Sequence, residues 1–163
     1  MSSNVATLHL VCGKIAAGKS TLVSELGQSP KTIVVREDYW LASLYPEELH
    51  SLADYARTSA RLRRAIAPHL IEVLRGGLSI VLDFPANTVD MRAWMRGLIE
   101  RAGCAHRLHY LEVSDEVCKA RLRQRNEDGK HEFVVSEEQF DLFTSHFVPP
   151  SDEEMFDVIL HRH

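Results

Sequence analysis

The sequence has no hydrophobic run of the roughly 18–20 residues that a helix needs to cross a bilayer, so we expect no membrane segment. Cysteine is scarce as well. Cys12, Cys104 and Cys118 form no C-x-x-C pair, which argues against a disulfide framework. With no secretory signal at the N-terminus, we expect reduced thiols and a cytoplasmic protein.

An excess of positive charge is also missing. The formal net charge is -4 at pH 7, which argues against a nucleic-acid partner, because broad binding to nucleic acid needs a basic face. A local basic patch remains allowed. The 163 residues are enough for one domain, predicted to span 1–163, and nothing in the sequence demands more than a monomer.

Short β-rich apolar runs alternate with longer helical patterns along the chain. Strands are predicted at 6–12, 31–36, 79–82, 106–113 and 156–160. Helices are predicted at 19–26, from Pro46 to about Arg75 with an interruption near Pro68, and at 89–102, 115–126 and 136–146. This alternation predicts an α/β fold of three layers with a parallel sheet of about five strands. Ligands of such sheets bind beyond the carboxyl ends of the strands.

A phosphate-binding loop follows the first strand. Gly13-Lys14-Ile15-Ala16-Ala17-Gly18-Lys19-Ser20 fits G-x-x-x-x-G-K-[ST] at every fixed position, with an apolar strand before it and a helix after it. Glycines let successive N–H groups point at phosphate oxygens, and the helix adds the positive end of its dipole. We therefore predict a P-loop NTPase fold that binds ATP through residues 13–21, with Thr21 directly after the motif.

Two residues of this loop have side-chain roles in the prediction. Lys19 places its charge between the β- and γ-phosphates, and Ser20 offers a hydroxyl to Mg²⁺. The sequence lacks the motifs that are typical of other classes of P-loop protein. The guanine-reading string Asn-Lys-x-Asp, the switch string Asp-x-x-Gly and the Leu-Ser-Gly-Gly signature of transport ATPases are all absent. A small kinase with a short helical lid at about 115–135 remains.

Charged residues at the expected ligand edge agree with phosphoryl transfer. Arg121 and Arg125 share one face of the helix after strand four, where arginines can stabilise the charge of a transferring phosphate. Asp83 ends the third strand and is a candidate for Mg²⁺. Glu37 and Asp38 end the second strand, and either one could act as the base toward an acceptor hydroxyl.

At these residues the chain resembles the small P-loop kinases grouped with phage polynucleotide 5′-kinase, zeta toxins and chloramphenicol phosphotransferase. The likeness is strongest at 10–21, at Val35-Arg36-Glu37-Asp38-Tyr39 and at Gln124-Arg125-Asn126. Residues 83–87, followed by Arg92, look like the loop after strand three in this group. The resemblance implies a base at 37 or 38, a lid arginine at Arg125, and an adenine-side segment at 147–150.

Two departures from the group bear on the acceptor. The arginine expected three residues after the base is missing, since Trp40 or Leu41 stands there. A second lid arginine is also missing, and Lys130 or Arg121 would have to replace it. With the acidic net charge, the first departure argues against a polynucleotide acceptor.

The acceptor pocket is expected between strands two and three. Tyr39, Trp40 and Tyr45 either line it or pack in the core. Arg57, Arg61 and Arg64 share a helix face and either clamp an anionic acceptor or form a solvated stripe. The leading hypothesis is a kinase that transfers the γ-phosphoryl of Mg·ATP to a small molecule. The alternatives are a regulatory nucleotide-binding module with little turnover and a nucleic-acid 5′-end kinase.

Overall fold

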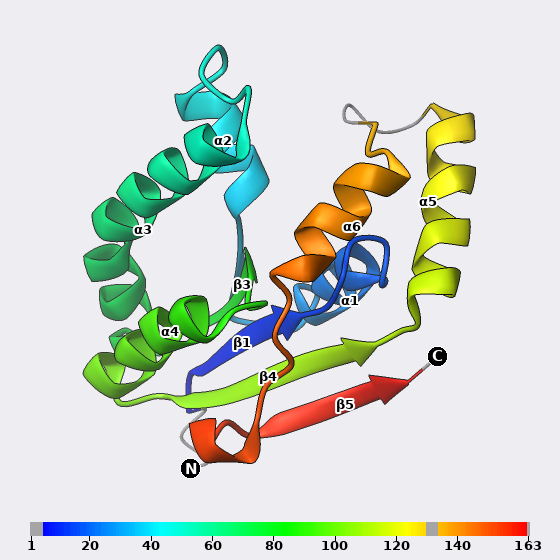
Figure 1. The fold of residues 1–163 in the computed structure, drawn as a ribbon. Coiled ribbons are helices and arrows are strands. Elements are labelled where there is room, and N and C mark those ends of the chain that lie inside the picture. Colours follow the sequence, from blue (N-terminus) through cyan, green and yellow to red (C-terminus); the bar gives the residue numbers. More distant parts are fainter. Residues whose placement is uncertain (1–4, 130–133, 163) are drawn as a thin grey trace.

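The computed structural model describes residues 5–129 and 134–162. Its centre is a parallel sheet in the order β2-β3-β1-β4-β5 (Figure 1). The strands are β1 (Thr7–Cys12), β2 (Thr32–Arg36), β3 (Ser79–Pro85), β4 (Ala105–Glu112) and β5 (Val158–Arg162). The α/β fold with five parallel strands is therefore confirmed.

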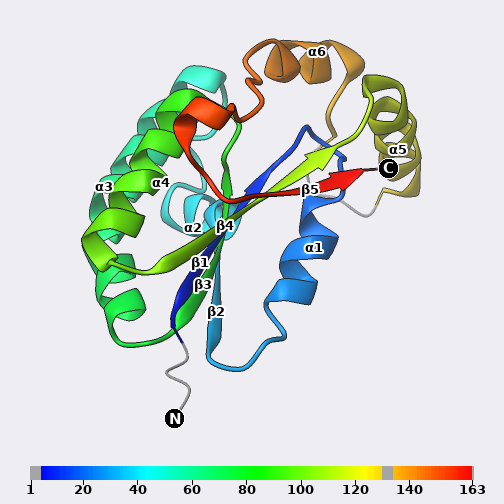
Figure 2. The ribbon, with the colours of Figure 1, turned by 90° about the horizontal axis from the view of Figure 1, so that it is seen from below.

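Within the described residues, six α-helices and one short 3₁₀ helix surround the sheet. They are α1 (Lys19–Leu26), α2 (Glu37–Leu44), α3 (Leu52–Arg75), α4 (Val89–Ala102), α5 (Asp115–Asp128), α6 (Glu137–Ser145) and η1 (Asp152–Glu154). Figure 2 shows α3 and α4 on one side of the sheet and α1 on the other. Among the described residues, no helix is both long enough and apolar enough to span a membrane.

Alternation along β1 builds both layers of the core. Leu8, Leu10 and Cys12 are fully buried in the cluster that contains α3 and α4. Val11 points to the opposite face and packs on Val23 of α1. Strands buried on both faces are rich in apolar side chains, and β1 and β3 are apolar at most positions. The sheet thus fixes the carboxyl ends of β1 and β3 side by side.

The structure corrects the predicted helices between β2 and β3. Residues 46–48 form a turn rather than a helix start, and α3 begins at Leu52, where the Ser51 side chain accepts from the Asp54 amide. Helix α2, which the prediction lacked, begins at Glu37 directly after β2. Pro68 lies inside α3, which is assigned as one helix from Leu52 to Arg75. These shifts matter because α2 carries Glu37 and Asp38 in its first turn.

Candidate nucleotide site

The phosphate loop joins β1 to α1 at the carboxyl edge of the sheet. Gly18 caps α1 with φ 104°, a conformation that favours glycine, and Ala16 has φ 63°. An alanine in the left-handed region costs roughly 1–2 kcal/mol, so the surrounding fold holds this turn against a local preference. Turns of this kind direct backbone N–H groups inward and form a concave anion site.

Lys19 reaches back across this loop. Its Nζ donates to the carbonyl of Gly13 and, at 3.3 Å, to that of Lys14. Burial lowers the pKa of Lys19, and the neighbouring Asp83 and Asp38 oppose that effect. The ammonium group therefore lies where the loop would hold phosphates, and two carboxylates are near enough to raise its pKa.

Side-chain hydrogen bonds anchor the first two residues of the loop. The Asn87 carboxamide binds Gly13 twice, accepting from its amide and donating to its carbonyl, each at 2.9 Å. Lys14 Nζ lies 2.5 Å from Asp115 Oδ1 and 3.3 Å from the Val113 carbonyl. The Lys14 side chain thus ties the loop to the start of α5, and only its backbone remains for a nucleotide.

The acids at the ends of β2 and β3 have different surroundings. Asp83 is half-buried, lies 3.4 Å from Arg36, and has its pKa raised by burial and then by Asp38. Asp38 is exposed in the first turn of α2. The structure therefore brings Asp38, Asp83 and Lys19 to one edge of the sheet, as the sequence predicts.

Glu37 lies on the other side of α2 from this group. It is 1% exposed, its Oε1 accepts a hydrogen bond from the Tyr55 hydroxyl, and its Oε2 accepts one from Ser59 at 2.8 Å. Burial raises the pKa of Glu37, and these two hydrogen bonds partly counter the rise. Its carboxylate is engaged with α3, unlike the exposed carboxylate of Asp38.

The arginines of α5 have three different environments. Arg121 donates to the carbonyls of Ala16 and Ala17 at 3.4 and 3.3 Å, so it lies against the phosphate loop. Arg123 pairs with Glu137 and joins α5 to α6. Arg125 has a buried Nε that makes no hydrogen bond to any residue within 5–129 and 134–162. Lys130, with part of the expected lid, lies outside the described residues.

The expected acceptor residues lie on α2, at its end and on α3. Arg57, Arg61 and Arg64 are exposed, and Arg57 lies 3.5 Å from Asp54 of its own helix. Tyr39 and Trp40 are exposed at 71% and 40%, so they do not pack in the core. Tyr45 packs at the edge of the core, as does Trp94, which stacks on Phe84.

Arg92 has a role that the sequence alone did not assign. It is fully buried, with its Nε 2.7 Å from Glu154 and its Nη1 donating to the carbonyls of Ala86 and Val148 at 2.9 and 2.8 Å. It therefore fastens the segment before β5 to the loop that carries Asn87. The sequence signal for its burial was its position three residues before Met95, which places Arg92 on the same face of α4.

A row of histidines crosses three strands on the α1 face of the sheet. His9 Nδ1 lies 3.2 Å from His109 Nε2, and His109 Nδ1 lies 3.1 Å from His161 Nε2. Each histidine is displaced by two residues from its neighbour in the register of β1, β4 and β5. No group of three or more potential ligands within 5–129 and 134–162 is arranged to hold a metal ion.

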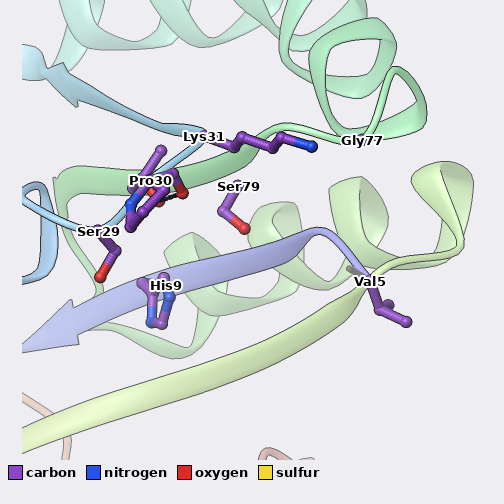
Figure 3. A pocket seen from close by; sticks show the side chains of 8 residues that line it. Val5, His9, Ser29, Pro30, Lys31, Gly77 and Ser79 are labelled. Atoms are coloured by element: carbon purple, nitrogen blue, oxygen red, sulfur yellow. Dashed lines mark hydrogen bonds between the residues drawn. The ribbon is translucent and has the colours of Figure 1, made fainter. Parts of the chain in front are cut away.

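A cavity of about 350 Å³ lies at the opposite end of the sheet (Figure 3). His9, Lys31, Gly77 and Ser79 help to line it, at the amino ends of β1, β2 and β3. Ligands of open α/β sheets bind at the carboxyl ends. We therefore place the functional site at the phosphate loop and assign this cavity no function.

Comparisons with known proteins agree with this geometry. The family model AAA_33, described as an AAA domain, matches residues 8–150. A search of curated proteins found no match.

Three solved structures illustrate the shared fold. Kti12 of Chaetomium thermophilum in complex with ADP-AlF3 has 15% identity and a TM-score of 0.72, over 95% of this chain and 88% of that one. The APS kinase CysC of Mycobacterium tuberculosis with AMPPNP and APS has 18% identity and a TM-score of 0.62, over 97% and 88%. A gluconokinase from Sinorhizobium meliloti 1021 has 14% identity and a TM-score of 0.60, over 99% and 84%. At these identities the likeness shows the fold alone.

Proposed function

The chain belongs to the AAA_33 family of AAA domains, and from that premise we propose that it is an ATP-dependent kinase that phosphorylates a hydroxyl of a small molecule. The phosphates of ATP bind the backbone of residues 13–21 and the first turn of α1. Lys19 leaves the loop carbonyls and places its charge between the β- and γ-phosphates. The nucleotides in the Kti12 and CysC structures support ATP as the donor.

Mg²⁺ fits the oxygen groups beside Lys19. The Ser20 hydroxyl is exposed at the start of α1, and the Asp83 carboxylate is near enough to Lys19 to act on its pKa. Hydroxyl and carboxylate oxygens are ligands that Mg²⁺ prefers, together with phosphate oxygens and water. When bound, the ion would offset negative charge on the β- and γ-phosphates.

The arginines of α5 complete the charge balance around the transferring group. Arg121 already lies against the loop at Ala16 and Ala17, and the buried Nε of Arg125 bonds to none of the residues that the structure describes. Phosphoryl transfer spreads charge over three oxygens, so movable arginines act by positioning and electrostatics. Closure of the segment around Arg121 and Arg125 would also exclude water and limit hydrolysis of ATP.

Asp38 is the better candidate for the base of the two acids. Its exposed carboxylate is in the group with Lys19 and Asp83, whereas both oxygens of Glu37 are bonded to Tyr55 and Ser59. We therefore assign Asp38 the contact with the acceptor hydroxyl. Glu37 instead fixes the first turn of α2 against α3 and so orients Asp38.

The convergence of Lys19, Asp38 and Asp83 carries this proposal. Binding of nucleotide alone does not require a second, exposed acid near Lys19, and Asp38 is such an acid. In a kinase that acid accepts, or orients, the proton of the attacking hydroxyl. The acidic net charge and the missing arginine after Asp38 favour a small acceptor over a nucleic-acid end.

The test is coupled ADP release with Mg·ATP across nucleosides, sugars, antibiotics and oligonucleotides, with Lys19→Ala as the blank. We expect at least one small-molecule class to stimulate release in the wild type and not in the blank. Stimulation by oligonucleotides alone would support the end-kinase alternative. Tight ATP binding with no stimulation by any class would favour the regulatory module.

A further inference from the structure

The carbonyl of Gly13 has two donors in this structure. One is Lys19 Nζ and the other is Asn87 Nδ2, at 2.9 Å. Gly13 is buried, so its carbonyl has little access to water. A buried carbonyl that loses its partners costs roughly the full desolvation penalty of the group. The hydrogen bonds to the Gly13 carbonyl therefore affect the free-energy cost of moving Lys19 away from it.

Nucleotide binding requires that departure. Lys19 is bonded to the carbonyls of Gly13 and Lys14, and it must turn from them to reach a phosphate. We propose that Asn87 is a positioning residue that keeps the Gly13 carbonyl paired when Lys19 moves to the phosphates of ATP. This inference rests on the proposed function, because it presumes that Lys19 binds those phosphates.

The carboxamide of Asn87 suits this role because it both donates and accepts. Its Oδ1 accepts from the Gly13 amide at 2.9 Å while its Nδ2 donates to the carbonyl. A carboxylate at this position could only accept, and an alanine could do neither. Gly13 also has little room to adjust, since a Cβ on it would meet Ala17 and Leu111, each at 3.3 Å.

The backbone of Asn87 is itself held in place, so the carboxamide stays when Lys19 leaves. The Asn87 carbonyl accepts from the Val148 amide at 2.9 Å. The preceding carbonyl, that of Ala86, accepts from buried Arg92, which also binds Val148 and Glu154. The segment before β5 thereby fixes Asn87, and Asn87 fixes the first residue of the phosphate loop.

Calorimetric titration of Asn87→Ala with Mg·ATP and with Mg·ADP tests the role. We expect binding about tenfold weaker than in the wild type, the effect of leaving one buried carbonyl unpaired in the bound state. Ser79→Ala is the matched control, since Ser79 Oγ accepts from the Thr7 amide at the other end of β1. It should leave nucleotide affinity unchanged. Unfolding curves establish that each variant is folded at the titration temperature.

A double-mutant cycle with Lys19→Met separates this role from general support of the loop. In that background no lysine leaves the Gly13 carbonyl, so Asn87→Ala should no longer weaken binding. Thermal shifts with millimolar Mg·ADP detect the weaker affinities of these variants. An equal loss in both backgrounds overturns the proposal in favour of a structural role. Unchanged affinity of Asn87→Ala beside a wild type that binds also overturns it. A wild type that binds no nucleotide would instead refute the proposed function.

Discussion

The two halves of the carboxyl edge are built in different ways. On the nucleotide side, contiguous residues 13–20 form the loop, and Asn87, Asp115 and Arg121 hold it from outside. On the acceptor side, α2 and α3 meet through buried Glu37, while Asp38, Tyr39 and Trp40 are exposed. The difference leads us to propose that one short motif binds the phosphate donor, whereas the acceptor binds beside the exposed residues of α2.

Each half also contains two residues of the same charge that differ in their burial or hydrogen bonding. Arg92 is buried and bonded to Glu154, Ala86 and Val148, whereas the buried Nε of Arg125 has no partner among the described residues. Glu37 is bonded through both oxygens, whereas Asp38 is exposed. We infer that the saturated member of each pair holds the fold and the free member meets substrate. The following predictions test that division.

Loss of the loop lysine should have the largest effect. Lys19→Ala removes the charge between the β- and γ-phosphates, and we expect kcat/KM to fall by roughly a thousandfold or more. Steady-state ADP release measures the change. Lys31→Ala, which alters an exposed lysine at the other end of the sheet, is the control and should retain full activity. Equal losses in the two variants would contradict the site.

The two acids of α2 should separate activity from stability. Asp38→Asn should lower kcat by roughly a hundredfold or more, because it removes the base, while leaving the free energy of unfolding unchanged. Glu37→Gln should do the reverse, lowering the free energy of unfolding by about 1–2 kcal/mol with a small change in kcat. Acceptor-dependent ADP release and urea denaturation measure the pair. A reversed pattern would make Glu37 the base.

The arginines of α5 sharpen the comparison on the nucleotide side. Arg125→Ala should lower kcat by roughly a hundredfold while the Kd for ATP stays nearly constant, as expected for a group that acts on the transition state. Arg123→Ala, which breaks the pair with Glu137, is the matched control and should change kcat little. A large loss of ATP affinity in Arg125→Ala without loss of kcat would count against this role.

The smallest expected effect lies away from both halves, in the histidine row. Burial, then the neighbouring His9, His161 and Arg107, lower the pKa of His109 to about 4. Burial and then Arg107 also lower the pKa of His9. These histidines bind protons more readily in the unfolded chain than in the folded chain. The free energy of unfolding should therefore fall as pH falls from about 6.5 to about 4.

His109 should contribute the largest part of that fall, because its pKa is lowered to about 4. Urea denaturation across this pH range measures it. The dependence of the free energy of unfolding on pH should be weaker in His109→Leu. It should persist in His69→Leu, where the histidine is exposed on α3. An identical pH dependence in the wild type and His109→Leu would contradict the account.

The sequence predicted where the phosphate loop lies in the fold, because the signals for it are local. Gly18, Lys19 and Ser20 stand at fixed spacing, and the alternation of strands and helices places the loop at the carboxyl edge. The short helix α2 was missed because its first turn, Glu37-Asp38, reads as a polar strand end. What makes it a helix is burial of Glu37 on Tyr55 and Ser59, at separations of 18 and 22 residues.

The remaining differences between sequence and structure have both local and long-range causes. Pro46 with two acids has the composition of a helix start, but Ser51 supplies the actual cap through its bond to Asp54. The row of His9, His109 and His161 depends on strand order and register, which single-sequence patterns do not contain. In the sequence, Arg92 cannot be told apart from an exposed helix arginine. Its partners Glu154 and Val148 are distant in the sequence, at separations of 62 and 56 residues.

The most direct test of the central claim is ³¹P NMR of the wild type with Mg·ATP and the acceptor class found by the ADP-release screen. The account predicts that the γ-phosphate resonance is lost as a phosphoester resonance on the acceptor appears, and that Asp38→Asn slows both changes together. Loss of the γ-phosphate only to inorganic phosphate, at a rate independent of acceptor and of Asp38, would contradict it and show a hydrolase.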